Sequence, residues 1–128
     1  YIICGATKIS KNENPKSLSI PKVVFNKNLD MIYMSRSIIP GIKVKKSSKK
    51  LQYWKQVCIY AFTKQDLKIF GKNKKKSYLE KIEDIEILRF LEKEKKIKMV
   101  KTKKGTIAVD YPRDIKMVEN LIKKNEKR

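Results

Sequence analysis

The chain has 128 residues and a formal charge of +20, which is enough length for one domain with a buried core. A hydrophobic fraction of 41% argues against intrinsic disorder, and the absence of histidine excludes imidazole-activated nucleophiles and zinc sites with histidine ligands. The apolar runs are too short to span a bilayer and no secretory signal is recognisable, so we expect a cytoplasmic protein that does not bind membranes.

The first half of the chain predicts β-strands. The runs KVVF (22–25) and MIYM (31–34) are separated by a turn-rich spacer, which predicts a β-hairpin and its following loop over residues 22–40. The run QVCIYAF (56–62) is apolar on both alternations, as is typical of a strand buried on both faces. Cys4 and Cys58 show no metal-ligand spacing, so we expect two reduced, buried thiols.

The second half alternates helices and strands. KQDLKIFG predicts a short helix that ends at Gly71, and a long helix is expected from about Tyr78 to Lys95 within the acidic segment 77–95. Its apolar residues lie on two sides, so we expect it to be covered on both. A final helix is expected over 112–124 and packs by one face. Its apolar stripe consists of Ile115, Val118, Leu121 and Ile122.

Two further short strands are expected, at 97–100 and 106–110, on either side of a turn at Gly105. Strands that alternate with helices predict an α/β fold, and the hairpin makes its sheet mixed. The expected architecture is therefore one mixed sheet with flanking helices.

The acidic side chains concentrate in one stretch, with six of the thirteen between residues 80 and 94. Ser77 and Glu80 match a capping box, which by itself explains Glu80. Glu83 and Glu86 fall on the apolar side of the expected helix, where each needs a partner: Arg89 for Glu86, and a strand or a ligand for Glu83. Residues 84, 92 and 94 are expected to be solvated counter-charges. A structural network and a binding site both remain open.

Two other residues are candidates for chemistry. Asp110 follows an apolar strand and precedes a helix that starts at Pro112, so it is either a turn or capping residue or a ligand of Mg²⁺. Lysine outnumbers arginine 29 to four, so an arginine retained in such a chain marks a place where a bidentate guanidinium is needed. Arg36 is accordingly either an anion ligand or a member of a surface ion pair.

Five motifs, taken together and in this order, resemble the carboxyl-terminal half of the 3-deoxy-manno-octulosonate (Kdo) cytidylyltransferases and the related enzymes that activate sialic-acid-like sugars. The resemblance runs from about Asn14 to about Leu121. The motifs are NPKSLSIPKVVFN, MIYMSRSIIPG, KQVCIYAF, SYLEKIEDIEILRFLE and GTIAVDYPRD. The helix motif SYLEKIEDIEILRFLE and the aspartate motif GTIAVDYPRD are the most specific.

The resemblance implies a nucleotide-diphosphosugar-transferase (GT-A-like) fold with a hairpin excursion, and transfer of CMP from CTP to a 2-keto-3-deoxy sugar acid. The product would serve the synthesis of lipopolysaccharide or another surface polysaccharide. By position, Asp110 corresponds to a ligand of Mg²⁺. Arg36, Gln56, Tyr60 and Glu80 correspond to sugar-acid contacts, with Gln56 standing where the Kdo enzymes have histidine.

The resemblance covers only the carboxyl-terminal half of the family's domain, so we expect residues 1–128 to lack the CTP-binding half. We therefore expect this chain by itself to be inactive, and a complete enzyme to be a homodimer without a nucleic-acid partner. Two alternatives remain. One is a basic nucleic-acid-binding module that uses the lysine runs 43–50, 72–76 and 95–104. The other is a non-catalytic fragment that forms a dimer surface.

Overall fold

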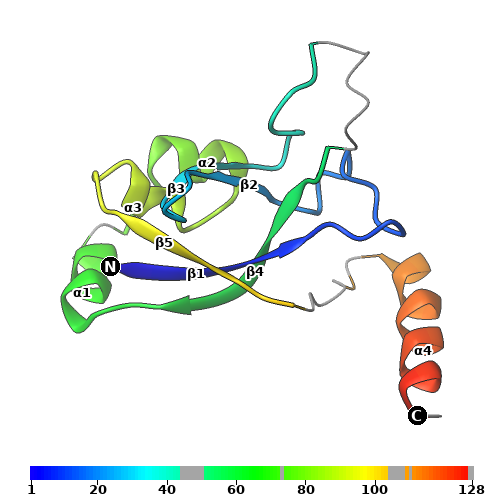
Figure 1. Ribbon diagram of the computed structural model, residues 1–128. Coiled ribbons are helices and arrows are strands. Elements are labelled where there is room, and N and C mark those ends of the chain that lie inside the picture. The colour runs from blue at the N-terminus through cyan, green and yellow to red at the C-terminus, as the bar shows by residue number, and fades with distance from the viewer. Residues whose placement is uncertain (44–50, 73, 104–108, 110, 127–128) are drawn as a thin grey trace.

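A mixed five-stranded sheet forms the body of the molecule (Figure 1). The structure is a computed structural model that describes residues 1–43, 51–72, 74–103, 109 and 111–126. The sheet has the order β3-β2-β4-β1-β5, in which β1 and β5 are parallel and the other neighbours antiparallel. The strands are β1 (Ile2–Lys8), β2 (Lys22–Phe25), β3 (Met31–Ser35), β4 (Trp54–Ala61) and β5 (Ile97–Lys101). The expected α/β class and the β2–β3 hairpin are confirmed.

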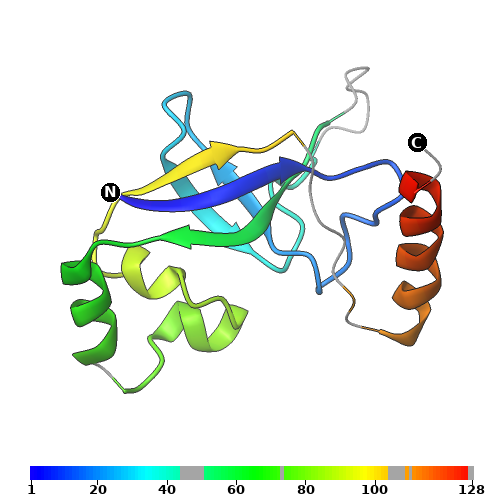
Figure 2. The same ribbon diagram turned by 90° about the horizontal axis from the view of Figure 1, so that it is seen from below.

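Three helices gather on one side of the sheet, and a fourth stands apart (Figures 1 and 2). The four are α1 (Lys64–Lys72), α2 (Tyr78–Glu83), α3 (Leu88–Leu91) and α4 (Pro112–Glu126). The turn after β2 reaches across to β5, where the Met99 amide donates to the Leu29 carbonyl at 2.7 Å. This contact joins the hairpin at one edge of the sheet to β5 at the other edge. The core combines residues of the sheet with residues 85–90 and includes Cys4, Met34, Ile87, Leu88 and Phe90.

The expected long helix over 78–95 is wrong, because the chain leaves the helical path at Asp84. Asp84 has φ 51° and ψ 49°, a left-handed conformation that aspartate tolerates better than most residues. The last carbonyl groups of α2 are then satisfied from outside the helix: Arg36 donates to the carbonyls of Glu83 and Asp84. A side chain from the hairpin therefore ends α2, and α3 starts in a new direction.

The expectation for the strand at 56–62 is only half correct. Residues 55–57 of β4 are buried, but Cys58 is exposed and Ile59 is 70% exposed. The pairing of β1 with β4 shifts register between Cys4 and Gly5, and this irregularity turns the far half of β4 outward. Cys4 is fully buried as expected, and burial raises the pKa of its thiol to about 12.

The helix α4 has the expected start and nearly the expected end, but two residues of its apolar stripe stay exposed. Ile115 and Ile122 are each about half exposed. The strand expected at 106–110 lies outside the described residues, apart from Val109. In the described ranges, no helix combines the length and the hydrophobicity needed to cross a bilayer.

Candidate functional site

A buried ion pair joins α2 to α3. Arg89 Nε lies 2.5 Å from Glu80 Oε2, and Arg89 Nη2 lies 2.6 Å from Glu80 Oε1. The side chain of Glu80 is 1% exposed and that of Arg89 is 8% exposed. The Ser77 amide also donates to Glu80 Oε2 at 3.1 Å, which confirms the capping box. The partner of Arg89 is therefore Glu80, and the expected pairing with Glu86 is wrong.

The surroundings of this pair keep both groups charged. Burial pushes the pKa of the Glu80 carboxyl upward, but the Arg89 guanidinium and the Ser77 amide outweigh it and hold the pKa below its usual range. Glu80 in turn raises the pKa of Arg89, whose guanidinium also lies 3.8 Å from the centre of the Phe70 ring. Both oxygens of Glu80 are thus engaged by the protein itself, and its sugar contact stays a prediction.

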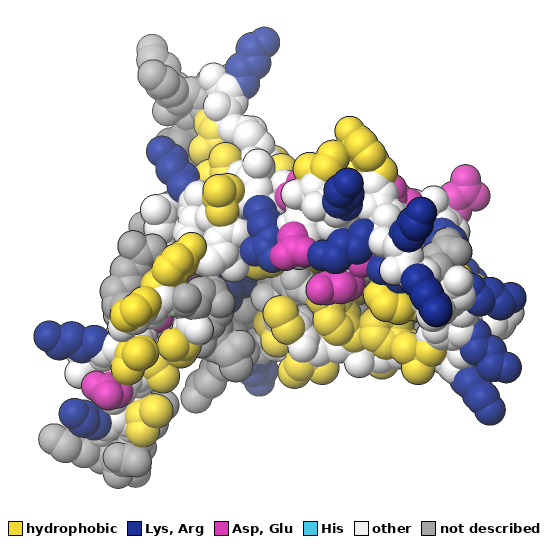
Figure 3. Space-filling model, turned by 180° about the vertical axis from the view of Figure 1, so that it is seen from behind, with side chains coloured by type: hydrophobic (Ala, Val, Ile, Leu, Met, Phe, Trp, Pro, Cys, Tyr) yellow, Lys and Arg dark blue, Asp and Glu magenta, His cyan; other side chains and the backbone are white. Residues whose placement is uncertain are grey.

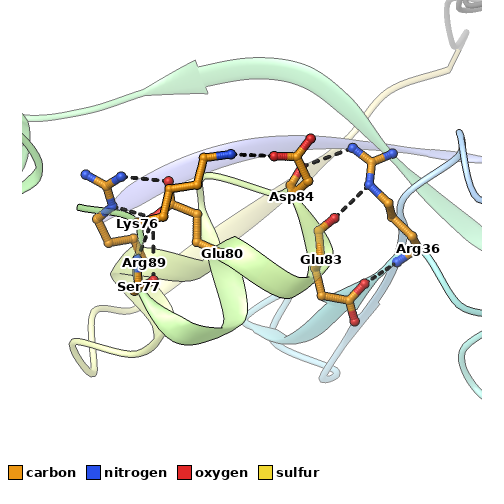
Figure 4. A network of polar contacts seen from close by, with 7 residues as sticks. All are labelled: Arg36, Lys76, Ser77, Glu80, Glu83, Asp84 and Arg89. Atoms are coloured by element: carbon orange, nitrogen blue, oxygen red, sulfur yellow. Dashed lines mark hydrogen bonds and ion pairs between the residues drawn. The ribbon is translucent and has the colours of Figure 1, made fainter. Parts of the chain in front are cut away.

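A second network holds the hairpin against the end of α2 (Figure 4). Glu83 Oε2 accepts a hydrogen bond from the Arg36 amide at 2.8 Å, and Glu83 Oε1 accepts one from Ser35 Oγ at 2.7 Å. A strand is therefore the partner of Glu83, one of the two options that the sequence left open. The guanidinium of Arg36 donates to the carbonyls of Glu83 at 2.7 Å, Asp84 at 3.0 Å and Leu18 at 3.0 Å.

The expected role of Arg36 in a surface ion pair does not describe these contacts, because its acceptors are backbone carbonyls. The main chain of Arg36 is held as well. Lys22, fully buried, donates from Nζ to the carbonyls of Ser17, at 2.8 Å, and of Arg36. Burial lowers the pKa of Lys22, and the charge of Arg36 adds to this while Glu83 opposes it. Arg36 is thus fixed through its side chain, its amide and its carbonyl.

An apolar pocket of about 220 Å³ opens beside the ion pair, between the end of β4 and the helices α1 and α3. The ring centre of Phe90 lies 5.3 Å from that of Phe62 and 5.4 Å from that of Phe70. The residues that line the pocket are Tyr60, Phe62, Leu67, Phe70, Glu86, Ile87 and Phe90. Glu86 is the charged residue in this lining.

The position of Glu86 corrects the sequence analysis. It was expected on a buried face of a continuous helix, but it is exposed and lies in the short connection between α2 and α3. Within the described residues, its carboxylate forms no hydrogen bond and no ion pair. The sequence contained a partial signal for the exposure of Glu86. Arg89 pairs with one carboxylate, so a second carboxylate nearby is left without a cation.

Gln56 and Tyr60, which the resemblance assigns to one site, are hydrogen-bonded to each other on β4. Gln56 is buried, and its Nε2 donates a hydrogen bond to the Tyr60 hydroxyl. Burial raises the pKa of Tyr60, the nearby Cys4, Cys58 and Glu86 add to the effect, and the bond from Gln56 opposes it. Tyr60 is therefore a neutral phenol at the edge of the pocket.

The described residues do not form a metal centre. No group of three or more cysteine, aspartate and glutamate side chains lies close enough together to hold an ion in this part of the chain. The predicted ligand Asp110 lies outside the described residues. Of the five predicted site residues, the structure therefore places Tyr60 in the pocket lining and Gln56 next to Tyr60. Glu80 lies in the buried ion pair, and Arg36 lies in the hairpin network.

Residues 1–97 match the model of the family described as "Cytidylyltransferase". The chain belongs to this cytidylyltransferase family. It is 43% identical over 105 residues to the 3-deoxy-manno-octulosonate cytidylyltransferase of Parabacteroides distasonis, covering 80% of this chain and 40% of that protein. It is 36% identical over 118 residues to the enzyme of the same name from Fusobacterium nucleatum, covering 92% of this chain and 46% of that protein.

A solved structure agrees with this assignment. The CMP:2-keto-3-deoxy-manno-octonic acid synthetase complexed with CTP superposes with a TM-score of 0.77 at 28% identity, covering 97% of this chain and 49% of that one. The chain thus has a nucleotide-sugar-transferase-like fold. It spans less than half the length of these relatives. Cytidylyltransferases of this family commonly use a divalent metal.

Proposed function

We propose that these residues form the sugar-binding side of an enzyme that transfers CMP from CTP to the anomeric hydroxyl of a 2-keto-3-deoxy sugar acid, Kdo or a related nonulosonate, and releases pyrophosphate. The observation that carries the proposal is the pocket, because Tyr60, a predicted sugar contact, lines it together with an unpaired carboxylate in a chain of this family. The relatives named for Kdo transfer and the neighbour solved with CTP support the same reaction.

The pocket suits one side of a sugar acid. Its aromatic rings can pack against the C–H face of a sugar, and the Glu86 carboxylate can accept hydrogen bonds from hydroxyl groups. Gln56, which is hydrogen-bonded to Tyr60, is neutral and adds no charge beside the pocket. Binding here would orient the sugar so that its anomeric hydroxyl attacks the α-phosphorus of CTP while pyrophosphate leaves.

Arg36 and Glu80 remain predicted sugar contacts, and each first requires a rearrangement. The guanidinium of Arg36 would have to share or release its carbonyl acceptors, and Glu80 would have to open its bonds to Arg89. For the metal, we propose Mg²⁺ at Asp110, with phosphate oxygens of the substrate completing its ligands. When bound, Mg²⁺ would neutralise charge on the phosphates.

The proposal includes the setting of the enzyme. We place it in the cytoplasm, as a homodimer, where its CMP-sugar product would feed the synthesis of lipopolysaccharide or another surface polysaccharide. A nucleic-acid partner is not part of the proposal. On the face shown in Figure 3, lysine and arginine side chains lie at several separate places, and aromatic side chains line the pocket and core.

The test is a coupled assay of pyrophosphate release with Kdo and CTP in a complete cytidylyltransferase that carries these residues. Release that requires both substrates, with formation of CMP-Kdo, is the expected result. The 128-residue chain assayed alone is expected to show no turnover. Sub-micromolar, salt-dependent binding of RNA or DNA at physiological salt, with no sugar-dependent release, would contradict the proposal and favour the nucleic-acid-binding alternative.

A further inference from the structure

The strand β4 changes neighbours along its length. In its first half it lies between two strands, and Lys55 pairs with Lys22 of β2. The next amide, that of Gln56, donates to the Pro21 carbonyl at 3.0 Å. Over residues 57–61, the described strands leave β4 with β1 as its one neighbour while it continues toward α1 (Figure 2). The side of β4 that faces away from β1 is therefore an open edge inside the sheet.

This open edge lacks the features that usually keep a strand edge from pairing. Natural edges are commonly blunted by charged side chains, by proline or by a covering segment. The run VCIYAF (57–62) has no charge and no proline, in a chain of which 36% is charged. At the far end of the sheet, by contrast, β5 carries Lys98 and Lys101 and is met by the hairpin turn at Leu29. The open part of β4 is thus an edge suited to take up another strand.

The side chains exposed at this edge are apolar as well. In the described pairing, the register shift leaves Cys58 and Ile59 without a partner residue on β1, and Ile59 is 70% exposed. Beside them Ile3 and Ala61, which pair with each other, are also exposed. A register shift can itself blunt an edge, but the side chains that it turns outward here add apolar surface. An added strand would bond to the edge and cover part of this surface.

The length of the relatives indicates where such a strand comes from. This chain spans less than half of these relatives, so the rest of each relative has to join the aligned half through some surface. The open edge of β4 offers main-chain hydrogen-bonding groups next to apolar side chains, and a strand of the sheet needs both. A second copy of this chain is the less suitable occupant, because two chains of charge +20 repel each other.

We propose that residues 57–61 are an interface at which a strand of the CTP-binding half of the enzyme adds to the sheet. This inference rests on the proposed function, which takes the part outside this chain to be that half. Main-chain hydrogen bonds along β4 join the two halves, and Cys58 and Ile59 become covered as the strand pairs.

Hydrogen exchange of main-chain amides tests this interface without any substrate. The 128-residue chain is compared with a complete cytidylyltransferase that carries these residues. The amides of residues 57–61 are expected to exchange about tenfold more slowly, or slower still, in the complete enzyme, because new strand hydrogen bonds protect them. Alkylation of the Cys58 thiol, located by mass spectrometry, should slow as well. Equal exchange at residues 57–61 in the two proteins would overturn the proposal.

A charge placed on the edge gives a second measurement. Ile59→Lys is expected to lower the thermal unfolding midpoint of the complete enzyme by about 5 °C or more, because the added strand would bury an unpaired ammonium. It should leave the midpoint of the 128-residue chain unchanged, since residue 59 is exposed there. Ile82→Lys, at a site on α2 that is 62% exposed, is the matched control and should leave both midpoints unchanged. Equal shifts from the two substitutions in the complete enzyme would contradict the proposal.

Two other results are distinguished by the same measurements. Protection of residues 57–61 in the 128-residue chain that grows with its concentration would assign the edge to a second copy and overturn the proposal. Failure of the proposed function gives a different result. The complete enzyme would then form no CMP-sugar, while the exchange of residues 57–61 would still show whether the edge is covered.

Discussion

Two carboxylates six residues apart in the same acidic stretch have opposite surroundings. Glu80 is 1% exposed and both of its oxygens are bonded to Arg89, whereas Glu86 is exposed at the pocket and forms no bond to any described side chain. The break at Asp84 separates them, because it ends the helix that would have placed both on related faces. A carboxylate with every oxygen engaged stabilises the fold, and one left beside a pocket is available to a ligand.

The largest expected effect comes from breaking the buried pair. Arg89→Met leaves the Glu80 carboxylate buried without its cation, and we expect a loss of about 3–5 kcal/mol in the free energy of unfolding, measured by urea denaturation of the chain. Lys81→Met, an exposed change on the same helix, should alter this free energy by less than about 0.5 kcal/mol.

If Arg89→Met fails to fold, Glu80→Gln combined with Arg89→Met provides the second measurement, because it removes the stranded charge and should recover part of the stability. Equal stability of Arg89→Met and Lys81→Met would contradict the structural role of the pair.

The next largest effect is expected at Glu83, which accepts from Ser35 and the Arg36 amide. Glu83→Gln replaces one carboxylate oxygen by a donor and should cost about 1–3 kcal/mol of unfolding free energy. Glu86→Gln should change the free energy of unfolding by less than about 0.5 kcal/mol, since no described group bonds to the Glu86 carboxylate. Thermal unfolding of Glu83→Gln and Glu86→Gln, measured side by side, compares the two losses of stability. Equal destabilisation of the two variants would contradict the different roles given to these carboxylates.

A smaller effect is expected from pH. The pKa of Glu80 is lower in the folded chain than its unfolded value of about 4.3, so its contribution to stability is fully present above that value and is lost as the pH falls through the folded pKa. The difference in unfolding free energy between the unchanged chain and Glu80→Gln should therefore narrow as the pH is lowered from 7 to 3. A difference that stays constant or widens would argue that Glu80 is not held ionised by Arg89.

Much of the fold follows from local patterns. The turn-rich spacer between two β-type runs predicted the hairpin, and the Ser77–Glu80 spacing predicted the capping box. The end of α2 could not be predicted in this way, because it depends on Arg36, which is 47 residues away in sequence from Glu83. The exposure of Cys58 likewise depends on a register shift between β1 and β4 that no local pattern shows.

The candidate site was predicted less well than the fold. The resemblance assigned Gln56 and Tyr60 to one site, and the structure joins their side chains by a hydrogen bond; their role as sugar contacts stays a prediction. The sequence explained Glu80 by its capping box and expected Glu86 on a buried face with Arg89 as its partner. The structure pairs Arg89 with Glu80 instead, and this tertiary contact could not be read from the helical pattern. Asp110 lies outside the described residues, and its role as a metal ligand stays a prediction.

The most direct test of this account compares Glu80→Gln with Glu86→Gln in a complete cytidylyltransferase that carries these residues. For each variant, the KM for Kdo and the thermal unfolding midpoint are measured on the same preparation. We predict that Glu86→Gln raises the KM for Kdo at an unchanged midpoint, and that Glu80→Gln lowers the midpoint. A raised KM with an unchanged midpoint for Glu80→Gln, together with normal kinetics for Glu86→Gln, would contradict the account.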